Sequence, residues 1–158
     1  MDRVGTGGCQ CGAVRFRATA LVGDAHVCHC RMCQKAVGNF FAALVGVPIP
    51  DLTWTRGAPA TWESSDGIDR GFCATCGTPL FYHYRAGGHV SLCIATFDEP
   101  AGIGLKFQSG AEGLLPQVAE LAHIKRTGTT EEDMPDEVVG IAASNRQHPD
   151  HDTESWPT

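Results

Sequence analysis

Seven of the eight cysteines in this chain fall into three short clusters, and this feature limits the possible folds more than any other. The clusters are Cys9-Gln10-Cys11, Cys28-His29-Cys30-Arg31-Met32-Cys33 and Cys73-Ala74-Thr75-Cys76. Zinc binds thiolates in a tetrahedral shell, and a C-x-x-C segment supplies two of them from one turn. Two clusters of two provide four ligands, which close a structural site, whereas the middle cluster provides only three. The sequence therefore predicts two zinc ions, one in a closed structural site and one in a more labile site with an open position.

Disulfide bonds are the alternative use of so many cysteines in a chain of 158 residues. The clusters are too tight for them, because a bond within C-x-C closes a small, strained ring. The first five residues lack the charged start and apolar run of a signal peptide, and no stretch reaches the roughly 18 apolar residues of a membrane span. We therefore expect a cytoplasmic protein without a membrane partner, in which clustered thiols are metal ligands.

The charge balance of the chain argues against a nucleic-acid partner. The formal net charge is −6 at pH 7, whereas a surface that binds phosphates requires an excess of Lys and Arg. With 158 residues, of which 42% are hydrophobic, the chain is long enough for one globular domain with a buried core.

Most of the apolar pattern has the two-residue period of β-strands. Strands are expected at residues 13–18, 40–47, 52–55, 60–63, 80–84 and 89–95. Turn segments rich in glycine separate several of them. Many short strands joined in this way are typical of an antiparallel, mainly β domain, which we expect to span residues 1–126.

The last part of the chain differs from this pattern. Apolar residues between Leu115 and Ala122 follow a helical spacing, which predicts one short C-terminal helix over residues 114–126. Acidic and polar residues dominate from Gly128 onward. We expect residues 127–158 to form a polar, acidic extension that is partly disordered, above all over its last dozen residues.

The spacing within each cluster suggests how its cysteines meet. Residues i and i+2 of an extended chain point to the same face, so Cys28 and Cys30 can reach one metal ion while His29 points away. His29 is then a core-facing or hydrogen-bonded residue, with a contact to substrate as the alternative. Glycines beside the other two clusters fit knuckle turns, in which backbone amides point at thiolate sulfur. This pattern assigns four residues to the closed site, namely Cys9, Cys11, Cys73 and Cys76.

Three motifs in order give the chain a resemblance to a known family. They lie at residues 8–16, 28–33 and 71–81. With them, residues from about 7 to 100 resemble the glutathione-dependent formaldehyde-activating (GFA) family, also called the centromere-protein-V/GFA domain. The resemblance implies stacked antiparallel sheets of the Mss4-like, or β-tent, type with zinc knuckles. It also implies a structural zinc at Cys9, Cys11, Cys73 and Cys76, and a zinc of the catalytic site at Cys28, Cys30 and Cys33.

The activity implied by the resemblance is that of a carbon–sulfur lyase, which joins glutathione and formaldehyde into S-hydroxymethylglutathione or handles a related small thiol adduct. A thiol at the open position of the zinc would lose its proton and attack formaldehyde. Candidate contacts for glutathione are the side chains beside the open cluster and one on a later strand, which are His29, Arg31, Lys35 and Arg85.

The last third of the chain departs from the family pattern. Members of the family commonly carry an aspartate-containing turn after the final core strand, and residues 97–100 fit that turn. A later His-Ile segment is matched by His123-Ile124, but the tryptophan that usually lies nearby is replaced by the distant Trp156.

Two other functions remain open from the sequence. In the first, the protein is a non-catalytic interaction module in which both zinc ions are structural and Cys93 or His83 fills the open position. In the second, the protein handles thiol redox chemistry or metal, and its middle cluster releases zinc on oxidation. The sequence also leaves the oligomeric state undetermined.

Overall fold

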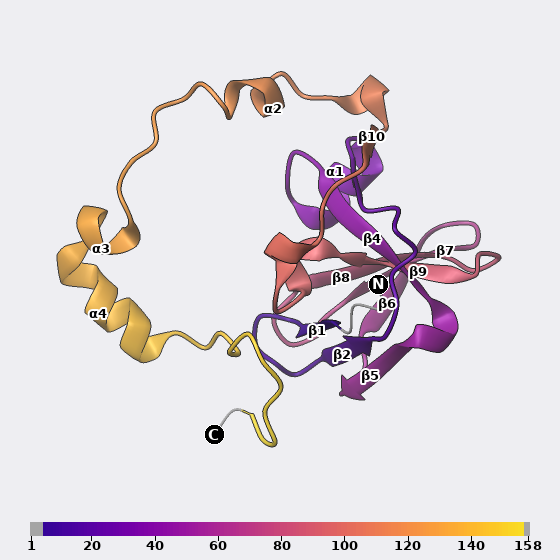
Figure 1. The fold of residues 1–158 in the computed structure, drawn as a ribbon, viewed down its shortest axis with the longest axis horizontal. Coiled ribbons are helices and arrows are strands. Elements are labelled where there is room, and N and C mark those ends of the chain that lie inside the picture. Colours follow the sequence, from indigo (N-terminus) through magenta and orange to yellow (C-terminus); the bar gives the residue numbers. More distant parts are fainter. Residues whose placement is uncertain (1–4, 157–158) are drawn as a thin grey trace.

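Two β-sheets make up the body of the protein in the computed structural model, which describes residues 5–156 (Figure 1). One sheet has the strand order β1-β2-β5 and the other the order β10-β3-β4-β9-β8-β7-β6. The smaller sheet consists of β1 (Gly5–Gly8), β2 (Arg15–Ala18) and β5 (Leu52–Arg56). The larger sheet consists of β3 (His26–Cys28), β4 (Ala42–Pro48), β6 (Ala60–Ser65), β7 (Ile68–Phe72), β8 (Pro79–Tyr84), β9 (His89–Cys93) and β10 (Phe107–Ser109). Among the described strands, β10 alone runs parallel to its neighbour, β3.

The apolar core lies between the two sheets. On β2, Phe16 is buried and Arg17 is exposed, as the two-residue period of a strand requires. Phe16 packs in the same cluster as Val45 of β4 and Leu92 of β9, which come from the larger sheet. The prediction of a mainly β fold with stacked sheets is therefore confirmed.

All six predicted strands are present, but the pattern missed four others. The missed strands are β1, β3, β7 and β10. Two of them have only three residues, β1 is Gly-Thr-Gly-Gly, and β7 carries a polar Asp-Arg-Gly run, so none shows a clear two-residue period. These segments are strands because ladder hydrogen bonds to neighbouring strands satisfy their backbone groups, a tertiary effect that local sequence does not encode.

A helix inside the middle cysteine cluster was also missed. This helix, α1, spans Arg31–Val37 and is preceded by Cys30, whose sulfur accepts a hydrogen bond from the backbone N–H of Cys33 over 3.5 Å. The strand β3 ends at Cys28, but Cys30 keeps an extended backbone with φ of −58° and ψ of 148°, so the sulfur atoms of both residues join one group as expected, and the helix begins only after Cys30.

The helix predicted over residues 114–126 is reduced to one turn. Only α2 (Gln117–Glu120) has α-helical structure there, and Leu114 and Leu121 beside it are about half exposed. Ile124 of this segment is exposed as well, so its apolar residues bury little surface, and short helices gain most of their stability from such burial.

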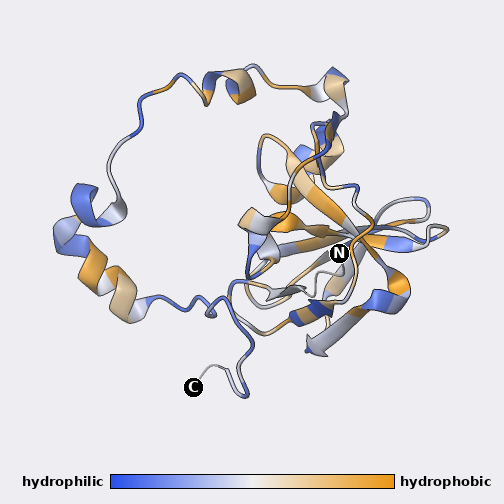
Figure 2. Ribbon diagram, viewed as in Figure 1, coloured by the Kyte–Doolittle hydropathy of each residue, from blue (hydrophilic) through white to orange (hydrophobic). Residues whose placement is uncertain are grey.

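The C-terminal part of the chain leaves the sheets in a wide arc that carries α2, α3 (Thr130–Asp133) and α4 (Pro135–Ser144) (Figure 1). Figure 2 shows hydrophobic residues on α4, where Val139 and Ile141 are exposed. After α4 the chain returns to the smaller sheet. No helix in the described part of the chain is long and apolar enough to cross a membrane. The division at residue 126 and the partial disorder of the extension stay predictions.

Candidate metal centres

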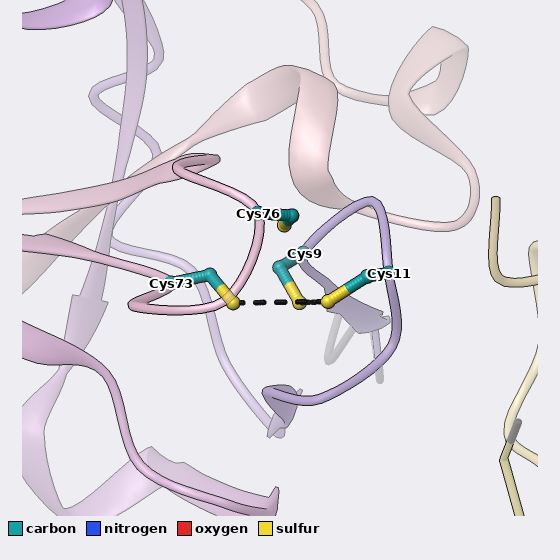
Figure 3. A group of neighbouring side chains, drawn as sticks. All are labelled: Cys9, Cys11, Cys73 and Cys76. Atoms are coloured by element: carbon teal, nitrogen blue, oxygen red, sulfur yellow. Dashed lines mark hydrogen bonds between the residues drawn. The ribbon is translucent and has the colours of Figure 1, made fainter. Parts of the chain in front are cut away.

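Cys9, Cys11, Cys73 and Cys76 lie together where two turns meet (Figure 3), and their sulfur atoms are all within 4.8 Å of one another. The first turn follows β1 and is closed by a hydrogen bond from the backbone N–H of Cys9 to the carbonyl of Val14. The second joins β7 to β8. In both turns a glycine has the left-handed conformation, with φ of 73° at Gly12 and 79° at Gly77, which residues with a side chain rarely adopt. The two turns thus connect the smaller sheet to the larger one through sulfur.

The spacing of these sulfur atoms fits a tetrahedral zinc site. Cys11 Sγ lies 3.6 Å from Cys9 Sγ and 3.8 Å from Cys73 Sγ. A tetrahedral shell with zinc–sulfur bonds of about 2.3 Å has sulfur atoms about 3.8 Å apart. The backbone N–H of Val14 also donates a hydrogen bond to Cys9 Sγ over 3.3 Å, as in zinc knuckles. Burial raises the pKa of the Cys9 thiol to about 12, so the thiol keeps its proton unless a metal ion displaces it.

A segment near the C-terminus, residues 148–156, packs against the first of these two turns. Trp156 Nε1 donates a hydrogen bond to the carbonyl of Cys11 over 2.7 Å, and the backbone N–H of His148 donates to the carbonyl of Gln10 over 2.7 Å. The two rings pack edge to face over Gly12, where an added Cβ would lie only 2.3 Å from His148. Trp156 is distant in sequence from every cysteine cluster, and its sequence position gives no sign of this contact.

The second group consists of Cys28, Cys30 and Cys33, whose sulfur atoms lie within 4.8 Å of one another. Cys28 comes from the end of β3, Cys30 from the residue before α1, and Cys33 from the first turn of α1. No fourth ligand atom from a His, Cys, Asp or Glu joins this group within residues 5–156. The group therefore offers three sulfur atoms that could hold a metal ion, one fewer than a closed tetrahedral shell requires.

Neither side chain that the sequence suggested as a fourth ligand belongs to this group. Cys93 packs against the residues around the cluster, but its sulfur does not join the three that lie within 4.8 Å of one another. His83 lies on β8 opposite Asp69, and its Nε2 is buried without a hydrogen-bond partner among the described residues. The structure does not support the arrangement in which Cys93 or His83 closes the second site.

His29 is a buried residue that helps to position the cluster. Its side chain is 1% exposed, and its Nε2 lies 2.8 Å from Gln108 Oε1 on β10. The Gln34 amide on α1 donates hydrogen bonds to the carbonyls of His29 and Gly113 over 2.8 and 2.7 Å. The segment between Cys28 and Cys30 is thereby tied to both the sheet and the helix.

A largely apolar cavity of about 460 Å³ lies against the residues that surround the three-cysteine group, although none of the three cysteines lines it. Val37, Ala42, Leu44, Tyr82 and Cys93 line it and also pack around the cluster. A second cavity of about 400 Å³ shares three of its lining residues, Ala36, Trp62 and Arg70. The two cavities adjoin beside α1, and we call them together the groove.

Only two of the three cationic residues proposed to contact glutathione lie near the cluster. Arg31 and Lys35, both on α1, line the second cavity. Arg85 forms ion pairs with Glu63 and Asp69 instead, and it is not part of either wall.

Arg70 lines both cavities, and the sequence analysis missed it because its strand, β7, was not predicted. Its Nη2 donates a hydrogen bond to Cys33 Sγ over 3.6 Å, and its guanidinium carbon lies 5.4 Å from the ring centre of Tyr82. One feature of the sequence could have indicated that Arg70 lies near the cysteines. Arg70 and Phe72 are two residues apart, so on a strand that leads to Cys73 they point to the same face.

Comparisons with known proteins agree with this arrangement. The model of the family described as glutathione-dependent formaldehyde-activating enzyme matches residues 4–109, which include all seven clustered cysteines. A Schizosaccharomyces pombe protein described as an uncharacterized lyase is 28% identical over 81 residues, which cover 51% of this chain and 58% of that protein. The chain therefore matches little more than half the length of that relative. A crystal structure of a Rhodobacter sphaeroides protein is 25% identical, with a TM-score of 0.55 over 66% of this chain and 99% of that one.

Proposed function

The chain belongs to the glutathione-dependent formaldehyde-activating enzyme family, and on that premise we propose that it is a zinc-dependent carbon–sulfur lyase acting on glutathione and formaldehyde or a related small thiol adduct. In the proposed reaction the thiol sulfur forms a bond to the carbonyl carbon. The π electrons of the carbonyl move to its oxygen, which takes up a proton as the thiol loses one. The product is S-hydroxymethylglutathione.

The observation that carries this proposal is the group of three thiols without a fourth protein ligand beside an apolar groove. Zinc held by Cys28, Cys30 and Cys33 would act as a Lewis acid that lowers the pKa of a thiol bound in the fourth position. The apolar walls exclude water from the bound thiol, which strengthens electrostatic interactions there. Cys9, Cys11, Cys73 and Cys76 would hold a second, structural zinc.

The cationic residues of the groove suit an anionic thiol. Glutathione carries two carboxylates at a distance of several bonds from its sulfur, and Arg31 and Lys35 line the cavity that continues from the cluster. We assign the carboxylate contacts to these two residues, because the guanidinium of Arg85 is already paired with carboxylates. The eight cysteines are all free thiols, which supports the cytoplasm as the proposed location.

We expect the zinc-loaded protein to form S-hydroxymethylglutathione faster than the two reactants do alone. Exchange NMR spectroscopy at equilibrium measures this rate. Cys30→Ser should return the rate to the protein-free background while leaving the chain folded, because it removes one of three ligands of the open centre. Arg85→Gln is the matched surface control and should keep the full rate. A rate equal to the background with the unaltered protein would refute the lyase function and favour an interaction module.

A further inference from the structure

Arg70 has no carboxylate partner, although it is a cation in the wall of an apolar groove. It stands on β7 between Trp62 of β6 and Tyr82 of β8 in the strand register. No Asp or Glu within residues 5–156 forms an ion pair with it, whereas Arg15 and Arg85 pair with carboxylates. A guanidinium has five N–H donors, and only the one to Cys33 Sγ has a partner here. Several donors therefore remain for a ligand in the groove.

The distance between Arg70 and the cysteine group indicates which part of a ligand it meets. Arg70 Nη2 is 3.6 Å from Cys33 Sγ. In a tetrahedral shell, the sulfur of a fourth ligand would lie about 4 Å from Cys33 Sγ. A ligand sulfur bound on the groove side of the cluster would bring the atoms one or two bonds from it within reach of the guanidinium. The carboxylates of glutathione lie much further from its sulfur, on the side where Arg31 and Lys35 are found.

We propose that Arg70 is a catalytic residue that donates a hydrogen bond to the aldehyde oxygen while the thiol adds to the carbonyl carbon. This inference rests on the proposed function. As the carbon–sulfur bond forms, the carbonyl π electrons become a lone pair on oxygen, and the N–H of Arg70 stabilises the resulting negative charge. The proton that neutralises this oxygen is the one released by the thiol, through solvent. Arg70 keeps its own proton, because arginine is not deprotonated in proteins.

The same contact should favour ligands that place a negative oxygen close to sulfur, as the adduct does while the carbon–sulfur bond forms. Stacking on Tyr82 and the hydrogen bond to Cys33 fix the plane of the guanidinium, so its donors are oriented before a ligand enters. Removing one donor of this kind from an enzyme lowers the rate by about 10²- to 10³-fold.

The test compares Arg70→Met, which keeps an unbranched apolar stem but has no guanidinium, with Arg70→Lys, which keeps the charge. Both variants should bind as much zinc as the unaltered chain, and glutathione affinity measured by calorimetry should change less than about threefold. The rate at saturating substrates should fall about 100-fold in Arg70→Met and less in Arg70→Lys. A rate that is unchanged in Arg70→Met, or a loss explained entirely by weaker glutathione binding, would overturn the catalytic role.

Two probe thiols give a measurement that does not depend on activity. Mercaptoacetate places a negative oxygen near its sulfur, whereas ethanethiol has no such group. The unaltered chain should prefer mercaptoacetate by about tenfold or more, because Arg70 donates a hydrogen bond to its charged oxygen, and Arg70→Met should lose this preference. If Arg70→Met preferred mercaptoacetate over ethanethiol as strongly as the unaltered chain does, the role of Arg70 would be wrong, but the proposed function would not be affected. No acceleration by the unaltered chain would instead overturn the proposed function, and the catalytic role with it.

Discussion

Cys73→Ser should abolish stable folding, whereas Cys30→Ser should leave a folded protein. Cys73 is 1% exposed and lies in the group that links the turn after β1 to the turn between β7 and β8. Zinc bound in such a site contributes about 10–16 kcal/mol in small zinc-dependent domains, which is comparable to the whole stability of a typical protein, about 5–15 kcal/mol. Cys30 precedes one short helix, α1, and joins no two sheets.

Circular dichroism and thermal melting of the two zinc-loaded variants measure this difference. Cys73→Ser should be insoluble or melt without a cooperative transition, and Cys30→Ser should melt cooperatively within a few degrees of the unaltered chain. Equal losses of stability in the two variants would show that the groups do not divide into a structural and an open site.

Asp98→Asn should lower the free energy of unfolding by about 3 kcal/mol, because the buried Arg15 guanidinium then keeps only the partly exposed Asp152 as a carboxylate partner. Arg15 Nη1 and Nη2 donate to the two oxygens of Asp98 over 2.8 and 2.6 Å, and the side chains are 4% and 8% exposed. Thr6 Oγ1 donates a further hydrogen bond to the carboxylate over 2.5 Å. The pair ties β1 and β2 to the turn after β9, which gives a physical role to the aspartate-containing turn noted in the sequence. At about 2–4 °C per kcal/mol, the melting temperature should fall by about 6–12 °C.

Asp152→Asn is the matched control, because Asp152 pairs with the same guanidinium over 2.8 Å but is 37% exposed. Its effect should stay below about 1 kcal/mol. Burial raises the pKa of the Asp98 carboxyl, but the hydrogen bonds from Arg15 and Thr6 lower it by more, so it lies below its ordinary value. The stability that the ionised carboxylate contributes is therefore present above about pH 4 and is lost as pH falls through the depressed pKa. Equal destabilisation by both substitutions, or an Asp98→Asn deficit that grows toward acid pH, would contradict this account.

The sequence predicted the fold class and the grouping of the cysteines well, for a simple physical reason. Knuckle turns are local structures, so C-x-C and C-x-x-C spacing is readable without knowledge of the tertiary fold. The structure brings the same seven cysteines together in the same two groups that the spacing suggested. Strands with a clear two-residue period, such as β2 and β4, were likewise predicted from local pattern.

What the sequence did not predict depends on contacts between distant segments. Arg70 faces the groove because β7 is held between β6 and β8, although β7 itself has little strand character. Trp156 reaches Cys11 across 145 positions of chain. The helix expected at residues 114–126 is mostly absent from the described structure. Its apolar residues stay largely exposed, so distant segments do not stabilise the helix that the local pattern predicted.

The central claim is that the three-cysteine centre accepts a thiol as its fourth ligand while the four-cysteine centre is closed. Cadmium-113 NMR spectroscopy of the cadmium-substituted protein tests it most directly, since the chemical shift of cadmium depends strongly on the number of sulfur ligands. We expect two resonances, one for each cysteine group. Glutathione should move one of them to the position of a four-sulfur site and leave the other unchanged. A single resonance, or two that both stay in place when glutathione is added, would contradict the claim.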